Sequence, residues 1–445
     1  MIHDVALIGI GIVGQVALEE LYQSNLKIIV IDEINTTSEL HFLRDIDGDK
    51  SVWTTGSRVG GYPGGRLNWG KNCSFVTIKG QPPLGEDIQS QLSKLSKRLK
   101  KYGFPKLNLV ELKQLGREKF YVKEAEDFFP GSWIKRIKSL ENVVVVSGFA
   151  TEILEESSGL ARIQVHRPGF KTGETVYAKK VIVCAGPFGT QELLANSGLI
   201  SEVSPRVWDH LSFSIQSIPL RKIQLAKFGL FGWNRFQRFN LKRCNVFYDK
   251  VNNILWTLRI FPEDVQSLDM TLSLLRMGIR KGEYWPCLTL IGKLIVSFAT
   301  GKLLYKQLKV HISADFLDES GSIKSASYAE GERIDFLAYQ RKSIPISEEF
   351  EQFISMTIEN LRLDFKNPIS LNLSGEIEVA EIQSSSHHMG TVWNDKNTQG
   401  SPVQVSRNIF VAGSAIFQAS VPGHPTMLAA ATSLIAADRI KSQLS

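Results

Sequence analysis

The pattern of hydrophobic and polar positions predicts that the chain begins with a strand, a turn, a helix and a second strand. Residues 4–9 form a short apolar run of the kind found in a fully buried strand. A helical pattern then continues to Gln23, and a second apolar run covers residues 27–31. Glycines fill the turn between the first strand and the helix, so the order is that of a βαβ unit.

Later segments alternate strands and helices without a clear linker. Strands are predicted at residues 142–146, 150–154, 161–166, 179–184, 310–316, 331–339 and 377–382, and helices at 84–125 and 348–363. The apolar run 179–184 ends in Ala185-Gly186, and a further helix is predicted to start near Gln191. Because no change of composition marks a boundary, we expect a second domain that is interwoven with the first.

Length and composition favour a globular protein with two packed domains. The chain has 445 residues, which is more than one compact core usually organises. Hydrophobic residues make up 43% and charged residues 22% of the chain, as in ordinary soluble proteins. The four cysteines are widely spaced, so neither a disulfide framework nor a metal site is expected. The first residues lack the features of a signal peptide, which predicts a cytoplasmic location.

The net charge of +7 is distributed unevenly along the chain. One basic cluster covers residues 94–101, and another covers residues 221–243, where basic and aromatic residues are interleaved. The second cluster is either a solvated basic face or a surface for anionic lipid or a negatively charged substrate. No nucleic-acid-binding motif accompanies the charge, so nucleic acid is not expected as a partner.

Residues 286–305 are the one segment of the sequence that invites comparison with a membrane span. Lys293 and Lys302 interrupt it, and the apolar run is shorter than the ~20 residues that cross a bilayer. We therefore expect a buried or interfacial amphipathic helix. Peripheral membrane contact through 221–243 or 286–305 stays open at this point.

A glycine motif follows the first strand and an acidic pair follows the second. The turn reads Gly9-Ile10-Gly11-Ile12-Val13-Gly14, and the second strand ends in Asp32-Glu33. Glycines at these positions permit a tight turn, close approach to a pyrophosphate and close packing of the helix on the strand. The helix N-terminus attracts the phosphates, and the acid accepts hydrogen bonds from ribose hydroxyls. The motif therefore predicts dinucleotide binding, and by itself it fits FAD and NAD equally.

Two further segments are typical of backbone that passes close to a ligand. Residues 56–70 are rich in glycine, which indicates either a flexible loop or amide groups that face a phosphate or a ring. Near the C-terminus a Ser-rich turn contains His387, a strand ends in Gly413-Ser414, and His424 precedes Pro425-Thr426 at the start of an Ala-rich helix. Imidazole groups in this order can accept or donate a proton beside the reactive edge of a bound ring.

Together these motifs resemble the glucose–methanol–choline (GMC) family of FAD-dependent oxidoreductases. The matching segments are residues 9–32, 64–70, 181–199 and 386–437, under a quarter of the chain. The C-terminal match is the most specific, because a histidine, Gly390-Thr391, a buried strand and a second histidine before Pro-Thr follow one another in the family's order.

The resemblance implies an α/β fold in which a Rossmann-like FAD-binding domain is interwoven with an α+β substrate-binding domain built on an antiparallel sheet. It assigns residues 1–75, 140–200 and 390–445 to the first domain, and 76–139 and 201–389 to the second. The implied cofactor-binding residues are Gly9, Gly11, Ile12, Val13, Gly14, Asp32, Glu33, Gly64, Gly65, Asn68, Trp69, Ala150, Ala185, Gly186, Gly413, Ser414, His424, Pro425 and Thr426. Some family members attach FAD through a histidine in the glycine-rich loop, where this chain has Asn68, so noncovalent FAD is expected.

The implied reaction is the oxidation of a CH–OH group to a carbonyl, with hydride transfer to flavin N5. His387 is expected to be the base that takes the alcohol proton and His424 its partner, and the reverse assignment stays open. The expected substrate is an alcohol, a sugar or a glycosylated intermediate, and the electron acceptor is oxygen or another molecule. Residues 200–305 match no motif of the family and are expected to form the substrate pocket.

Three other functions fit parts of the sequence. A non-oxidative or light-driven FAD enzyme would use residues 221–243 to hold a lipid-like acid, although the presence of both histidines argues against it. A flavin-binding protein without turnover would associate with a membrane or a protein partner. A dehydrogenase that uses NAD alone would need the first motif but not the C-terminal segment.

Overall fold

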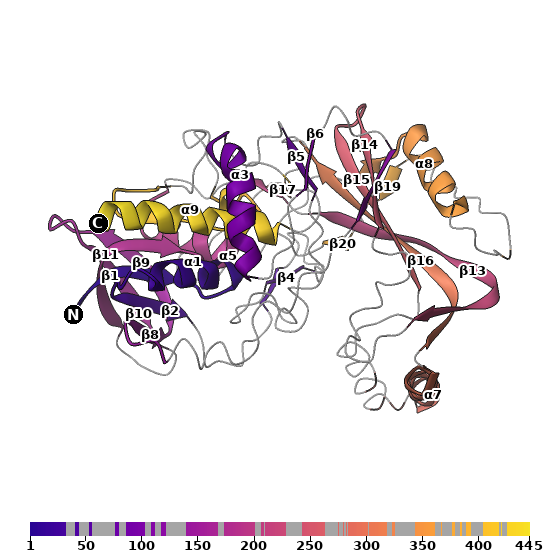
Figure 1. Ribbon diagram of the computed structural model, residues 1–445, viewed down its shortest axis with the longest axis horizontal. Coiled ribbons are helices and arrows are strands. Elements are labelled where there is room, and N and C mark those ends of the chain that lie inside the picture. Colours follow the sequence, from indigo (N-terminus) through magenta and orange to yellow (C-terminus); the bar gives the residue numbers. More distant parts are fainter. Residues whose placement is uncertain are drawn as a thin grey trace.

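The computed structural model has two lobes, each built around one large β-sheet (Figure 1). It describes residues 1–32, 41–43, 53–55, 76–79, 86–102, 108–111, 117–121, 139–167, 173–200, 206–208, 210–227, 243–262, 275, 279, 282, 284–300, 302–317, 323–324, 343–360, 366, 376–378, 383–384, 389–392, 404–417, 420 and 425–445. Both chain termini lie in the first lobe, at the left of Figure 1.

The sheet of the first lobe has seven strands in the order β8-β2-β1-β11-β10-β9, with β21 paired to the end of β11. β8, β2, β1, β11 and β21 run parallel, whereas β10 pairs antiparallel with β9 and with the first half of β11. The bounds are β1 (Ile2–Ile8), β2 (Ile28–Asp32), β8 (Val143–Ser147), β9 (Phe149–Glu155), β10 (Ala161–His166), β11 (Glu174–Val183) and β21 (Ile409–Val411). The chain thus returns near its end to the sheet in which it begins.

Helices cover the parallel strands of this sheet. α1 (Ile12–Tyr22) packs against α9 (Thr426–Leu444), and α3 (Glu86–Leu99) crosses α9 (Figure 1). α5 (Gly186–Asn196) follows β11 directly. Val5, Leu7 and Val30 are completely buried, as expected for parallel strands that lie between two layers.

The second lobe is built on a six-stranded antiparallel sheet in the order β20-β13-β16-β15-β14-β7. Its longest strands, β13 and β16, cross the whole lobe (Figure 1). The bounds are β20 (Gln383–Ser384), β13 (Leu211–Lys227), β16 (Lys302–Phe316), β15 (Ile254–Pro262), β14 (Arg243–Asp249) and β7 (Arg117–Tyr121). The first lobe is therefore built on a mostly parallel sheet and the second on an antiparallel sheet.

Two helices accompany the second sheet. α8 (Glu348–Glu359) follows Ser347, whose side chain caps the start of the helix. Its Phe350 ring stacks on the Trp256 ring, with ring centroids 4.2 Å apart. α7 (Tyr284–Thr300) lies at the far end of β13 and β16 (Figure 1). None of the described helices combines the length and apolarity needed to cross a membrane.

Short elements complete the described chain. Four two-stranded ladders join β3 (His41–Leu43) to β4 (Trp53–Thr55), β5 (Val76–Lys79) to β6 (Asn108–Glu111), β12 (Arg206–Val207) to β17 (Ile323–Lys324), and β18 (Ser343–Pro345) to β19 (Glu376–Glu378). Two 3₁₀ turns, η1 (Lys100–Tyr102) and η7 (Ser414–Ile416), follow α3 and β21.

Most predicted elements are confirmed, and three of them differ from the structure. The helix predicted over 84–125 is wrong beyond Leu99, because residues 108–111 and 117–121 pair as strands with distant partners. The helix expected near Gln191 already begins at Gly186. The segment 286–305 is not one helix, since α7 ends at Thr300 and β16 begins at Lys302. The strand predicted at 331–339 and residues 379–382 of the strand predicted at 377–382 lie outside the described residues.

The predicted division of the chain into two domains stays a prediction. The strands of the first sheet come from residues 2–32, 143–183 and 409–411, and those of the second come from 117–121 and 211–384. α3 belongs to the range assigned to the substrate-binding domain, yet it packs on α9 of the first lobe.

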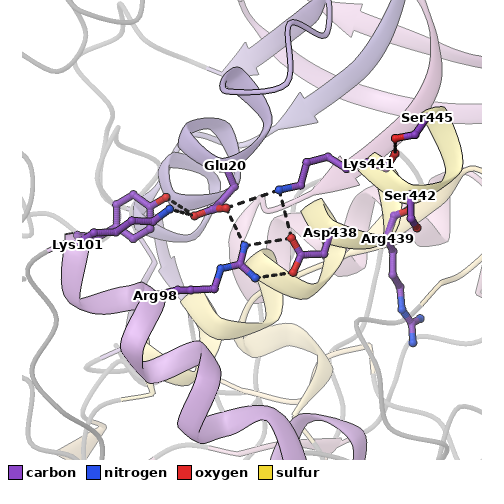
Figure 2. Close-up of polar contacts among 9 residues, drawn as sticks. Glu20, Arg98, Lys101, Asp438, Arg439, Lys441, Ser442 and Ser445 are labelled. Carbon is purple, nitrogen blue, oxygen red and sulfur yellow. Dashed lines mark hydrogen bonds and ion pairs between the residues drawn. The ribbon is translucent and has the colours of Figure 1, made fainter.

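A cluster of charged side chains fixes α3 to α1 and α9 (Figure 2). The Glu20 carboxylate of α1 is only 5% exposed and accepts hydrogen bonds from Arg98 Nη2 at 2.7 Å and from the Tyr102 hydroxyl at 2.6 Å, and it pairs with Lys101. Arg98 also donates two hydrogen bonds to the Asp438 carboxylate of α9. The cluster therefore joins three helices that are far apart in sequence.

This environment lowers the pKa of Glu20 from 4.5 to about 2. Burial alone would raise the pKa, but the hydrogen bonds from Lys101, Tyr102 and Arg98 outweigh it. A carboxyl whose pKa is depressed in the folded state stabilises the fold above its ordinary pKa. That contribution disappears as the pH falls from about 4.5 toward 2.

Glu20→Gln is expected to lower the free energy of unfolding at pH 7 by about 2–3 kcal/mol, after allowance for solvent screening of the exposed partners. The difference from the unsubstituted protein should shrink as the pH falls from about 4.5 toward 2, because Glu20 is protonated first in the unfolded state and only near pH 2 in the folded state. Urea unfolding at a series of pH values measures this. The control is Glu359→Gln, which removes an exposed charge at the end of α8. A Glu20→Gln effect that is independent of pH would contradict the assignment.

Candidate functional site

The ends of three parallel strands bring distant segments of the chain together. β1, β11 and β21 run in the same direction and are neighbours, so their carboxyl ends lie at one edge of the sheet. The Cys184 N–H donates to the Ile8 carbonyl at 2.7 Å, and the Ala412 N–H donates to the Val183 carbonyl at 3.0 Å. The turns after the three strands contain Gly9, Ala185-Gly186 and Gly413-Ser414. Such an edge is where open α/β sheets bind their ligands.

Glycine is required at two positions of the first turn for steric reasons. Gly9 has a φ of +88°, and a Cβ placed there would lie 2.5 Å from the carbonyl oxygen of Cys184. A Cβ at Gly14 would lie 2.0 Å from the carbonyl oxygen of Gly9. The first glycine therefore lets the β1 turn approach the β11 turn, and the last lets α1 approach the β1 turn. Gly11, Ile12 and Val13 form the start of α1 between them.

The acid at the end of β2 is held against the same turn. Asp32 Oδ2 accepts a hydrogen bond from the Ile10 N–H at 2.5 Å, and the Gly9 N–H donates to the Ile31 carbonyl at 2.9 Å. The Gly148 N–H donates to the backbone carbonyl of Asp32 at 3.1 Å, so the start of β9 and its residue Ala150 lie on the Asp32 side of the turn. The predicted nucleotide-binding residues at this end of the site thus form one connected group.

Residues 389–392 follow His387 and His388 in the sequence, and hydrogen bonds hold them to three other parts of the chain. Gly390 N–H donates to the Ser414 carbonyl and Val392 N–H to the Ala415 carbonyl, both at 2.9 Å. The Thr391 hydroxyl donates to the Pro187 carbonyl of α5 at 2.6 Å. Met389 and Trp208 exchange two backbone hydrogen bonds. Residues 389–392, which follow the two histidines in the sequence, are therefore held beside the ends of β11 and β21.

Gly390 has its own steric requirement in that corner. Its φ is +78°, and a Cβ there would lie 2.3 Å from the indole ring of the completely buried Trp208. A side chain at this position would displace the backbone that leads to His387.

The start of α9 reaches the same edge. Gly413 N–H donates to the Thr432 hydroxyl of α9 at 2.8 Å, which connects the turn after β21 to the helix. Pro425 and Thr426 are buried at the beginning of α9, immediately after His424. The amide groups of a helix N-terminus attract negative charge and polarised groups, so this end of α9 is suited to a ligand.

A buried polar cluster, which the sequence motifs did not reveal, connects the second lobe to the C-terminal segment. Asp315 of β16 is completely buried and pairs with His210 Nδ1 at the start of β13. The Ser420 hydroxyl, four residues before His424, donates to the same Asp315 oxygen at 2.8 Å. The cluster therefore holds Ser420, which precedes His424 by four residues in the sequence.

The structure brings together the predicted residues Gly9, Gly11, Ile12, Val13, Gly14, Asp32, Ala150, Ala185, Gly186, Gly413, Ser414, Pro425 and Thr426. Glu33, Gly64, Gly65, Asn68, Trp69, His387 and His424 lie outside the described residues, so their roles stay predictions. No sequence signal marked His210, Asp315 or Ser420, because isolated polar residues in strands and turns usually face solvent.

The fold just described, a parallel nucleotide-type sheet beside a large antiparallel sheet, is shared with solved flavoenzyme structures. Pyridoxine 4-oxidase from Mesorbium loti aligns over 98% of this chain and 99% of its own, with 12% identity and a TM-score of 0.51. An FAD-dependent oxidoreductase from Chaetomium thermophilum aligns over 99% of both chains, with 14% identity and a TM-score of 0.50. A formate oxidase from Aspergillus oryzae aligns over 99% of this chain and 98% of its own, with 11% identity and a TM-score of 0.52.

These likenesses show the fold of the chain and agree with its resemblance to the GMC family. Neither family models nor curated proteins match the sequence.

Gly14→Ala is expected to lower the free energy of unfolding by about 2–3 kcal/mol, because the added Cβ overlaps the Gly9 carbonyl and the backbone must move. Gly292→Ala is the matched control, since a Cβ at this helical position meets no atom within 4 Å. The control should be neutral or stabilising. Urea unfolding measures both variants, and equal stabilities would contradict the steric argument.

Asp315→Asn is expected to destabilise the fold by about 3 kcal/mol, because it replaces the buried carboxyl group that contacts both His210 and Ser420 by an amide. Ser420→Ala removes one hydrogen bond and should cost about 1 kcal/mol. A double-mutant cycle of Asp315→Asn with His210→Gln, followed by urea unfolding, measures the coupling. Additive effects of the two substitutions would show that the pair does not act as a unit.

Proposed function

We propose that the protein is an FAD-dependent oxidoreductase that oxidises a CH–OH group of an alcohol, a sugar or a glycosylated intermediate to a carbonyl. The observation that carries the proposal is the convergence of the β1, β11 and β21 turns with the start of α9 and the segment after His387. The structural likeness to FAD-dependent oxidoreductases over nearly the whole chain supports it.

The described residues fit a dinucleotide such as FAD. The backbone around Gly9 and Gly14 is packed so closely that side chains are excluded, which leaves amide groups at the N-terminus of α1 to face a pyrophosphate. Asp32 is held beside this turn, where its carboxylate can accept hydrogen bonds from ribose hydroxyls. Bound FAD would accept the hydride that leaves the carbinol carbon.

The protein's own part in the reaction is to bind the alcohol, exclude water and accept the hydroxyl proton. His387 is proposed to accept that proton on a ring nitrogen, because a neutral imidazole is a competent base near pH 7. His424 is proposed to hold the alcohol oxygen from the other side, and the exchange of these two roles is tested below. The anchored residues 389–392 and the buried start of α9 would keep both imidazoles in place.

FAD is proposed to be held without a covalent bond. The glycine-rich loop has Asn68 in the place where some members of the resembled family have a histidine attached to the flavin. Release of free FAD on acid denaturation of the purified protein tests this part of the proposal.

The purified protein is expected to show flavin absorption bands that bleach when one class of alcohol or sugar is added without oxygen. His387→Ala and His424→Ala should both retain FAD and bleach at least about a hundredfold more slowly, in line with the loss of general base catalysis. The variant whose rate rises again at high pH, where solvent takes the proton, identifies the base. The measurement is stopped-flow absorbance at the flavin bands over a range of pH.

His388→Ala is the matched control, since it changes the histidine next to His387 at a position where the resembled family commonly has proline, so that no proton role is expected. Its bleaching rate should stay close to that of the unsubstituted protein. A protein that binds no FAD after reconstitution, or a flavin that no alcohol bleaches, would overturn the proposal.

A further inference from the structure

Helix α7 presents a continuous apolar stripe to solvent. Trp285 is 79% exposed, Leu288 59% and Ile295 62%, and Tyr284 and Ile291 beside them are also exposed. These positions repeat with the three- and four-residue spacing of one helix face. Cys287 is buried on another side of the helix. A stripe of this size on a helix is unusual for a surface that faces only water.

Strand pairing brings a basic segment to the same place. β13 and β16 are antiparallel, and Lys227 at the end of β13 is in register with Lys302 at the start of β16. Lys302 follows α7 after a single intervening residue. The irregular stretch of β13 between Pro219 and Gln224 contains the exposed residues Arg221 and Lys222. Two segments that are separate in sequence, residues 221–227 and 284–308, thus form one tip of the second lobe.

Among the described residues of this tip, the charge has one sign. Residues 221–227, 284–300 and 302–308 contain six basic residues (Arg221, Lys222, Lys227, Lys293, Lys302 and Lys306) and no acidic residue. Figure 1 shows α7 at this end of the lobe, away from α8 and from the first lobe. Exposed Trp and Tyr rings at the start of the helix are typical of the boundary between water and lipid.

We infer that α7 and the adjoining ends of β13 and β16 form a docking surface for an anionic membrane. The apolar stripe enters the interface between head groups and acyl chains, and the basic residues bind the negatively charged head groups. Both contributions are needed, because a stripe of this length is too short to cross the bilayer and a handful of charges alone gives weak, salt-sensitive binding. An apolar protein partner would not require the uniform positive charge.

Because the surface is positively charged, binding to an anionic membrane can be distinguished experimentally from binding to other partners. The purified full-length protein is mixed with vesicles of phosphatidylcholine alone or with on the order of 30% phosphatidylserine, and bound protein is measured by vesicle flotation. We expect binding to the anionic vesicles, little binding to the neutral ones, and a decrease in binding as salt is raised.

Leu288→Asp combined with Ile295→Asp is expected to lower the vesicle partition coefficient at least about tenfold, because it places two negative charges in the stripe. Arg221→Gln with Lys222→Gln should lower it severalfold and weaken its salt dependence. All four side chains are on exposed positions, so circular dichroism and the melting temperature should stay unchanged.

Val251→Asp is the matched control. Val251 is 84% exposed on the turn between β14 and β15, in the same lobe but beyond the opposite end of β16. It should bind vesicles like the unsubstituted protein. Equal binding to neutral and anionic vesicles, no binding to either, or an equal loss in Val251→Asp would overturn the inference. A stripe that instead drives self-association, seen as a change of sedimentation coefficient in Leu288→Asp/Ile295→Asp without vesicles, would also overturn it.

Discussion

The pairing of β21 with β11 is the constraint on which the candidate site depends. Three backbone positions of β21, a strand near the C-terminus, are in register with Val181, Ile182 and Val183. This parallel pairing sets the turn after β21 beside the turns after β11 and β1, and it fixes where α9 begins. Without it, the turn after β21 would not lie beside the glycine turn at the N-terminus. The site is therefore a product of long-range strand pairing and cannot be assigned to either end of the chain alone.

The second lobe contributes to that site through contacts that begin at its own strands. Trp208 pairs with Met389, and Asp315 joins His210 to Ser420. Residues just before β13 and in β16 therefore hold Met389 and Ser420, which lie close in sequence to His387 and His424. Small shifts of such anchors are expected to matter, because proton transfer and hydride transfer depend on distances of a few tenths of an ångström. Hydrogen bonds from residues in and beside the antiparallel sheet thus hold Met389 and Ser420 of the C-terminal segment in place.

Local patterns predicted β1, α1, β2 and the turn between them, because strand burial, helix periodicity and glycine turns are all signals within about thirty residues. The same reasoning failed for β6 and β7, which are short and are stabilised by partners far along the chain, such as β14 for β7. His210, Asp315 and Ser420 could not be found for the same reason, since each is separated from its partner by 105 residues. The roles of His387 and His424 still rest on motif order and on the anchored residues that follow them.

The docking surface and the candidate site lie at opposite ends of one strand. β13 starts at Leu211, beside the His210 and Asp315 pair, and ends at Lys227, beside α7. At about 3.3 Å per residue, a strand of 17 residues spans at most roughly 55 Å, and the register shifts shorten it. Residues at the tip therefore lie at the other end of β13 from the His210 and Asp315 pair. The proposed membrane binding and the proposed alcohol oxidation rest on different side chains, so the failure of either proposal would leave the other intact.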